Sequence, residues 1–229
     1  MMIEVTAIRH GQSAANVALA AAAAAGLVDS GITGRDADVT LTNVGRRQAA
    51  HVGWWLAELP SDRRPDVAVC SPYLRARETW RVAMAAAAAI GVTLPEPALD
   101  DRLVDRLLGE WELLTIAAIN QRYPEEAARR WETDEFIFRP PGGETFGDLA
   151  ERVASFVADA RRRYAGRRLV IVAHDAVILM LRKVLDGLSW PEIRAVNDAG
   201  SVANGSVSQW ADSGSGLRLV SYNLVDHLS

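Results

Sequence analysis

The stretch IEVTAIRHGQSAAN, residues 3–16, decides how this chain begins to fold. Its first six residues alternate between apolar and polar side chains, which predicts a β-strand. Arg9 and His10 then lie in a turn, and Ser13 is placed to cap a helix that runs through the alanine-rich residues 14–26. A strand that turns sharply into a helix is the unit from which α/β folds are built.

The same alternation continues along the rest of the chain. Further strands are expected at residues 66–70, 169–173, 202–210 and 217–223, and helices at 42–59, 73–90, 125–131, 145–160 and 174–185. Strands separated by helices favour a mostly parallel central sheet with helices on both faces. Neither a repeat nor a linker divides the sequence, so we expect a single α/β domain over residues 1–229.

Composition excludes several classes of protein. The 229 residues are 49% hydrophobic and 24% charged, an ordinary globular balance, and the formal net charge is −4. A mildly acidic surface is poorly suited to nucleic acid, whose phosphates require basic residues. The longest apolar run has 12 residues, too few to cross a bilayer, and the single cysteine predicts no internal disulfide. No signal peptide is visible. We therefore expect a soluble cytoplasmic protein that binds neither nucleic acid nor membranes.

Two histidines directly follow predicted strands: His10 follows the first, and His174 follows the most apolar. In open α/β sheets, ligands collect at the carboxyl ends of the strands. Arg9 precedes His10, and Arg75 lies in the first turn of the helix after residues 66–70. Because a guanidinium group matches the geometry of phosphate oxygens, these residues predict an anion-binding pocket.

Six segments, in chain order, resemble signature motifs of the first branch of the histidine phosphatase (phosphoglycerate mutase-like) superfamily. They are RHGQSAAN (9–16), DVTLTNVGRRQA (38–49), SPYLRARET (71–79), GGET (142–145), IVAH (171–174) and NGSV (204–207). Any one of these motifs is a weak signal. Six ordered matches spread over residues 3–210 are a strong one, and the chain resembles a member of this superfamily over nearly its whole length.

The resemblance implies a three-layer sandwich and a metal-independent phosphomonoesterase that acts on a small phosphorylated metabolite. His10 would be the nucleophile and would form a phosphohistidine. Four residues would hold the phosphoryl oxygens: Arg9, Asn16, Arg75 and His174. No cofactor is implied, no metal-ligand spacing such as CxxC or HExxH occurs in the sequence, and a homodimer is left open.

The general acid has two candidates because the chain departs from the family pattern twice. Residues 103–113 read LVDRLLGEWEL, so Asp105 stands where the family usually has glutamate. Asp175 follows His174 where the first branch has glycine, and another branch of the superfamily uses an aspartate there as its acid. Asp105 is favoured because the remaining motifs resemble the first branch. An acid at either place needs a pKa raised by burial or by a like charge.

Two other functions compete with the phosphatase. A phosphoglycerate mutase-type phosphotransferase would carry a longer substrate lid, whereas residues 111–140 form a short segment here. A catalytically inactive phosphate-binding scaffold would have lost some of the reactive residues, and this chain retains Arg9, His10, Arg75 and His174. The sequence therefore favours the hydrolase.

Overall fold

The computed structural model describes residues 2–229, which contain a six-stranded sheet with the strand order β3-β2-β4-β1-β5-β6. The strands are β1 (Glu4–Arg9), β2 (Val67–Cys70), β3 (Pro97–Leu99), β4 (Arg168–Ala173), β5 (Val207–Asp212) and β6 (Leu217–Leu224). The helices are α1 (Ala14–Ala24), α2 (Asn43–Glu58), α3 (Leu74–Ala88), α4 (Ile116–Arg122), α5 (Pro124–Glu132), α6 (Phe146–Arg163), α7 (Asp175–Asp186) and α8 (Trp190–Asp198). The strands from β3 to β1 are parallel, and β5 and β6 are antiparallel at one edge. The predicted mostly parallel α/β sheet is confirmed.

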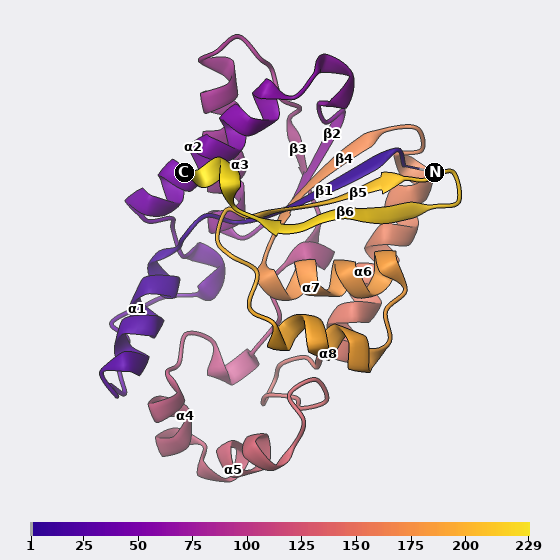
Figure 1. Ribbon diagram of the computed structural model, residues 1–229. Coiled ribbons are helices and arrows are strands. Elements are labelled where there is room, and N and C mark those ends of the chain that lie inside the picture. The colour runs from indigo at the N-terminus through magenta and orange to yellow at the C-terminus, as the bar shows by residue number, and fades with distance from the viewer. Residues whose placement is uncertain (1) are drawn as a thin grey trace.

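The two faces of the sheet are covered by different helices. Along β4, Leu169 and Ile171 pack in a core with α6 and α7, whereas Val170 and Val172 pack in a second core with α2 and α3. Figure 1 shows α2 and α3 above the sheet and α6, α7 and α8 below it. Because strand side chains alternate between faces, one apolar strand supplies both cores.

The helices that frame the carboxyl edge begin at side-chain caps. The Ser13 hydroxyl oxygen accepts a hydrogen bond from the backbone N–H of Asn16, and the side-chain oxygen of Asn16 accepts the backbone N–H of Ser13, which completes a capping box. Thr42 caps α2, and Thr145 caps α6. These hydroxyl residues satisfy backbone N–H groups that have no partner inside the helix. The helix starts expected from the sequence are confirmed.

Strand register brings the two histidines together. β1 pairs with β4 so that Arg9 lies opposite Ala173, and the next residue of each strand is His10 and His174. The connection that follows β1 places α2 on one face of the sheet, whereas the connection that follows β4 places α7 on the other face. Such a divergence opens a crevice at the carboxyl ends of two neighbouring strands.

Four elements differ from the expected ones, and one of them is α4, a seven-residue helix that the sequence did not predict. β3 is a three-residue edge strand, too short for a hydrophobic alternation to reveal. α8 was not expected; it begins at a capping box between Ser189 and Glu192, which corresponds to an S-x-x-E pattern in the sequence. The strand expected from residue 202 begins only at Val207. The N–H of Gly205 donates to the carbonyls of Arg9 and His10 at the end of β1, outside the regular pairing of β5 with β1.

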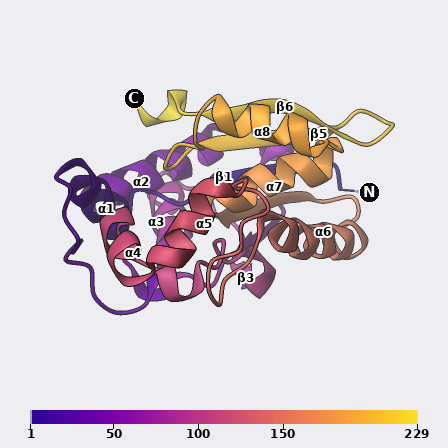
Figure 2. The same cartoon turned by 90° about the horizontal axis from the view of Figure 1, so that it is seen from below.

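The segment between β3 and α6 forms a cover over the carboxyl edge. It holds α4 and α5, and Thr115 at the start of α4 donates a hydrogen bond to the carbonyl of Val28, 2.8 Å away, beyond the end of α1. Figure 2 shows α4 beside α1 and next to α5. Within residues 2–229, none of these helices is both long and apolar enough to span a membrane.

Gly45 provides a test of how tightly the turn after β1 is packed. A Cβ at this position would lie 2.1 Å from the carbonyl oxygen of Gln12, and one at Gly11 would lie 2.3 Å from the carbonyl oxygen of Gly45. Gly45→Ala should therefore lower the free energy of unfolding by about 1–3 kcal/mol, the usual cost of overpacking. Urea unfolding followed by circular dichroism measures it.

Gly147→Ala is the matched control, because Gly147 also lies in the first turn of a helix and meets only the Thr145 hydroxyl, at 3.3 Å. It should leave stability unchanged or raise it slightly, since alanine favours helix. Equal losses in the two variants would show that the contact with Gln12 does not constrain the turn.

Candidate active site

His10 is buried and its two ring nitrogens have different partners. Nδ1 lies 2.7 Å from the carbonyl oxygen of Gly11, and a carbonyl only accepts, so Nδ1 carries the proton. Burial, His174 and Arg75, followed by Arg9, hold the pKa of His10 well below its usual value. The ring is therefore neutral near pH 7. Nε2 keeps a lone pair, and it accepts a hydrogen bond from Nε of Arg75 at 3.2 Å.

His174 lies against His10 with the ring centroids 5.2 Å apart. Its Nε2 is 2.9 Å from the hydroxyl of Ser71, which also accepts the backbone N–H of Tyr73. Burial, Arg75 and Arg9 keep the pKa of His174 well below its usual value, so this ring is neutral too. Its Nδ1 is buried and makes no hydrogen bond to any part of the chain that the structure describes. In the tautomer that accepts the Ser71 hydroxyl at Nε2, Nδ1 carries the proton, and the carboxylate oxygen near it, Oδ2 of Asp105, is 3.4 Å away.

Arg9 and Asn16 also have donors to offer. Arg9 donates through Nη1 to the carbonyl of Val202, and its Nε is buried without a partner among residues 2–229. The side-chain oxygen of Asn16 accepts hydrogen bonds from Ser13 and Asn204. That orientation leaves the Asn16 amide N–H groups for a ligand. Unpaired buried donors at one site are the signature of a binding pocket for an anion.

The loop that carries Asp105 is held from behind by a buried ion pair. Arg152 of α6 contacts Glu144 at 2.5 Å and donates to the backbone carbonyls of Arg102 and Asp105. Glu144 in turn accepts the N–H of Leu107. The GGET turn thus serves the site by fixing this loop. Separating the two charges would leave each of them largely buried and uncompensated. The ion pair therefore favours one position of the Asp105 loop.

Asp105 and Asp175 both lie at the site with different surroundings. Oδ2 of Asp105 is 3.0 Å from Nη2 of Arg75 and 3.4 Å from Nδ1 of His174. Oδ2 of Asp175 is 3.5 Å from Nη2 of Arg9. Desolvation by the surrounding protein raises the pKa of Asp175, and the charge of Asp105 adds to this although Arg9 opposes it. A carboxyl with a raised pKa can hold a proton for a leaving group.

These residues surround a cavity of about 290 Å³. Six of the seven residues predicted from the sequence line it, namely Arg9, His10, Asn16, Arg75, Asp105 and Asp175, while His174 lies behind them, fully buried. Its charged lining also includes three residues that the sequence did not single out: Asp36, Arg106 and Glu112. Among residues 2–229 no three His, Cys, Asp or Glu side chains are grouped so that they could hold a metal ion.

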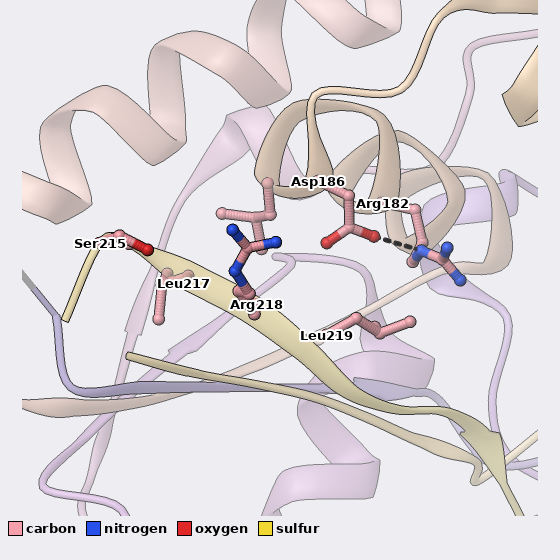
Figure 3. Close-up of a pocket in the computed structure, with 8 residues that line it drawn as sticks. Arg182, Asp186, Ser215, Leu217, Arg218 and Leu219 are labelled. Carbon is pink, nitrogen blue, oxygen red and sulfur yellow. Dashed lines mark hydrogen bonds and ion pairs between the residues drawn. The ribbon is translucent and has the colours of Figure 1, made fainter. Parts of the chain in front are cut away.

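A second cavity, of about 480 Å³, lies between α7 and the β5–β6 hairpin and shares no lining residue with the first. Figure 3 shows Arg182 and Asp186 paired at its wall, with 2.5 Å between Nε and Oδ2. The indole N–H of Trp210 donates to the other oxygen of Asp186 at 2.6 Å. The polar groups of this wall thus tie the hairpin to α7.

Comparison with known proteins gives a family. The model of the histidine phosphatase superfamily, branch 1, matches residues 5–225. The chain belongs to this branch of the superfamily.

Cys70, inside β2, is consistent with packing alone: burial raises the pKa of its thiol to about 12, which keeps it unreactive.

Individual relatives include proteins of several activities. A bifunctional protein of Mycobacterium tuberculosis is 36% identical over 79% of this chain and 46% of its own length. A 2,3-bisphosphoglycerate-dependent phosphoglycerate mutase of Gloeobacter violaceus is 31% identical over 82% of this chain and 78% of its own. The structure of a mycobacterial glucosyl-3-phosphoglycerate phosphatase with VO3 has a TM-score of 0.72 and 27% identity, covering 97% of this chain and all of that one. The chain spans about half the length of the bifunctional protein and of two other mycobacterial relatives that are 36% identical to it.

The histidine pair predicts how stability depends on pH. Both pKa values are lowered in the folded state, while an unfolded histidine titrates near 6.5. Below about pH 6.5 the unfolded chain therefore takes up protons that the folded chain does not. This contribution to stability is complete above that pH and is lost as the pH falls, by up to about 1.4 kcal/mol per pH unit for each histidine.

Urea unfolding of the wild type, His10→Asn and His174→Asn between pH 8 and pH 5 measures this dependence. Each variant should lose stability less steeply than the wild type below pH 6.5, whatever its stability at pH 8. Curves that run parallel to the wild type would contradict the lowered pKa values.

Proposed function

We propose that the chain is a phosphomonoesterase in which Nε2 of His10 is the nucleophile. The observation that supports this most is a buried, neutral His10 whose unprotonated nitrogen accepts a hydrogen bond from Arg75 and whose ring packs against that of His174. A lone pair surrounded by cationic and neutral donors suits attack on a phosphoryl group, because the donors stabilise charge on the transferring oxygens.

The reaction has two displacements. In the first, the Nε2 lone pair of His10 forms a bond to phosphorus as the bond from phosphorus to the ester oxygen breaks. The acid transfers its proton to that oxygen, and an alcohol leaves. In the second, a water oxygen attacks phosphorus, the phosphorus–nitrogen bond breaks, and the carboxylate takes up a water proton. Inorganic phosphate leaves and both residues return to their starting states.

Asp105 is our first candidate for the acid, and Asp175 is the alternative. Asp105 contacts Arg75 and approaches His174, so its carboxyl lies next to the donors that would hold the phosphoryl group. Asp175 has the raised pKa that an acid needs, and it lies beside Arg9. The position of the carboxyl group therefore supports Asp105, whereas the raised pKa supports Asp175.

The charges around the cavity bear on the substrate. Four carboxylates line it, Asp36, Asp105, Glu112 and Asp175, against three arginines. Arg106 donates to the carbonyls of Phe138 and Glu144 and covers the ring of Phe146, so it is engaged away from a ligand. Once Arg9 and Arg75 hold a phosphate, a carboxylate on the leaving group would meet mainly like charge. We infer a small monophosphate ester with an uncharged or cationic leaving group.

The first test of this function is His10→Ala. The variant should lose all but a small residue of p-nitrophenyl phosphate hydrolysis while the fold remains intact by circular dichroism, since the side chain faces a cavity. His51→Ala is the matched control, because His51 lies outside this site, on α2, and should leave turnover unchanged. Retention of more than a few per cent of activity in His10→Ala would remove His10 as the nucleophile.

The mutase alternative receives support from the relative in Gloeobacter violaceus. Glycerol 3-phosphate and 3-phosphoglycerate separate the candidates, because they differ only in a hydroxymethyl group against a carboxylate. The phosphatase releases phosphate and favours glycerol 3-phosphate, whereas a mutase isomerises 3-phosphoglycerate. No reaction on either, or on a broad panel of phosphate esters, would indicate an inactive phosphate-binding scaffold.

The choice between the two aspartates rests on leaving-group chemistry. An alkyl ester needs a full proton transfer to its leaving oxygen, whereas p-nitrophenyl phosphate needs little. Asp105→Asn should therefore slow alkyl esters about 10²–10⁴-fold more than the aryl ester, and it should flatten the basic limb of the pH–rate profile. Asp175→Asn should be milder and less dependent on the leaving group. The reverse pattern would assign the acid to Asp175.

A further inference from the structure

We propose that Asp36 is a positioning residue that orients the Arg75 guanidinium toward the phosphoryl group. This inference rests on the proposed function, since it concerns the arginine of that site. Asp36 lies in the loop between α1 and α2, where the sequence shows no periodicity, and its carboxylate enters the cavity lined by His10 and Arg75.

The five N–H groups of Arg75 divide between two edges of the guanidinium plane. Nε donates to Nε2 of His10 at 3.2 Å, and Nη2 donates to Asp105 at 3.0 Å, so this edge faces the reacting groups. Nη1 and Nη2 donate to the two carboxylate oxygens of Asp36, each at 3.0 Å. Nη1 also donates to the backbone carbonyl of Asp36 at 2.7 Å. Asp36 thus holds the edge that points away from the nucleophile.

This division allows a phosphoryl group to replace His10 and Asp105 as the acceptor at the reactive edge. A phosphoryl group bonded to Nε2 of His10 would take the Nε and Nη2 donors in a bidentate contact, while Asp36 keeps the opposite edge. Because an arginine side chain has many rotamers, a carboxylate on its far edge limits the orientations in which the near edge can meet the transition state. The side chain of Arg75 is only 4% exposed, so this pair is shielded from solvent.

The loop itself is anchored to the helix that carries Arg75. The N–H of Leu41 donates to the carboxylate of Glu78, one turn after Arg75 on α3, at 2.8 Å. The same carboxylate group pairs with Arg46 of α2 at 3.0 Å. Asp36 and Arg75 therefore share one support. A carboxylate that only occupied the phosphate position until displaced would need neither this anchor nor the main-chain contact.

The experiment uses five proteins and a control: the wild type, Asp36→Ala, Asp36→Asn, Arg75→Ala, the double variant Asp36→Ala/Arg75→Ala, and Asp38→Asn as the control. Asp38 lies two residues further on in the same turn and pairs with Arg35 at the surface, so it matches Asp36 without touching Arg75. The readouts are kcat and KM for p-nitrophenyl phosphate, inhibition by orthovanadate, and calorimetric binding of inorganic phosphate. Thermal melting verifies that each variant is folded.

Asp36→Ala should lower kcat and weaken vanadate inhibition about tenfold, with a smaller loss of phosphate affinity, because vanadate mimics the geometry of transfer. Asp36→Asn, which keeps one acceptor, should fall between. In the Arg75→Ala background the change at Asp36 should have no further effect, since both substitutions remove one interaction. Asp38→Asn should match the wild type.

Three results would overturn the inference: tighter phosphate binding or faster turnover in Asp36→Ala, an equal loss with and without Arg75, or no change. The first would make Asp36 a competitor of phosphate. Phosphate and vanadate binding need no turnover, so they test Asp36 even if no ester is hydrolysed. Conversely, hydrolysis that depends on His10 but not on Asp36 would reject this inference and leave the proposed function standing.

Discussion

The hydrogen bond from Nδ1 of His10 to the carbonyl of Gly11 is the constraint on which the site depends. It sets the tautomer of a buried ring, so the nitrogen that faces Arg75 is the one with a free lone pair. The turn that provides this carbonyl is itself compressed, with Gly11 and Gly45 in backbone contact that no side chain would permit. Thr79 reinforces it by accepting the N–H of Gly11 at 3.0 Å. Because the tightly packed turn fixes the Gly11 carbonyl, it also fixes which ring nitrogen of His10 carries the proton.

The charges at the site are arranged as neighbouring pairs of opposite sign. The two arginines proposed to hold phosphate each have a carboxylate nearby, Asp175 beside Arg9 and both Asp36 and Asp105 beside Arg75. Such pairing keeps two buried cations at fixed places close to two neutral histidines. Glu112 forms no ion pair with an arginine among residues 2–229, and burial followed by the charge of Asp36 raises its pKa. The part of the cavity lined by Asp36 and Glu112 is therefore rich in carboxyl groups.

The sequence predicted the fold and the residues that surround the cavity because both leave local patterns. Strand alternation placed His10 and His174 at strand ends, and cap residues such as Ser13 marked helix starts. Asp36 left no such pattern, because its role depends on how an irregular loop meets α3. Arg152 left only a weak pattern in the sequence. It lies among Leu149, Val153 and Phe156 on the apolar face of α6, where a cation requires a partner of opposite charge. Partners distant in sequence, such as Glu144 and the Asp105 loop, emerge only from tertiary structure.

Rapid-quench labelling with a ³²P-labelled ester tests the central claim most directly, namely that His10 takes the phosphoryl group. The account predicts an acid-labile phosphoryl group that forms on the enzyme within one turnover, maps to the peptide containing His10 by mass spectrometry, and is absent from His10→Ala. Turnover without any enzyme-bound phosphoryl group, or label on a different residue, would contradict it.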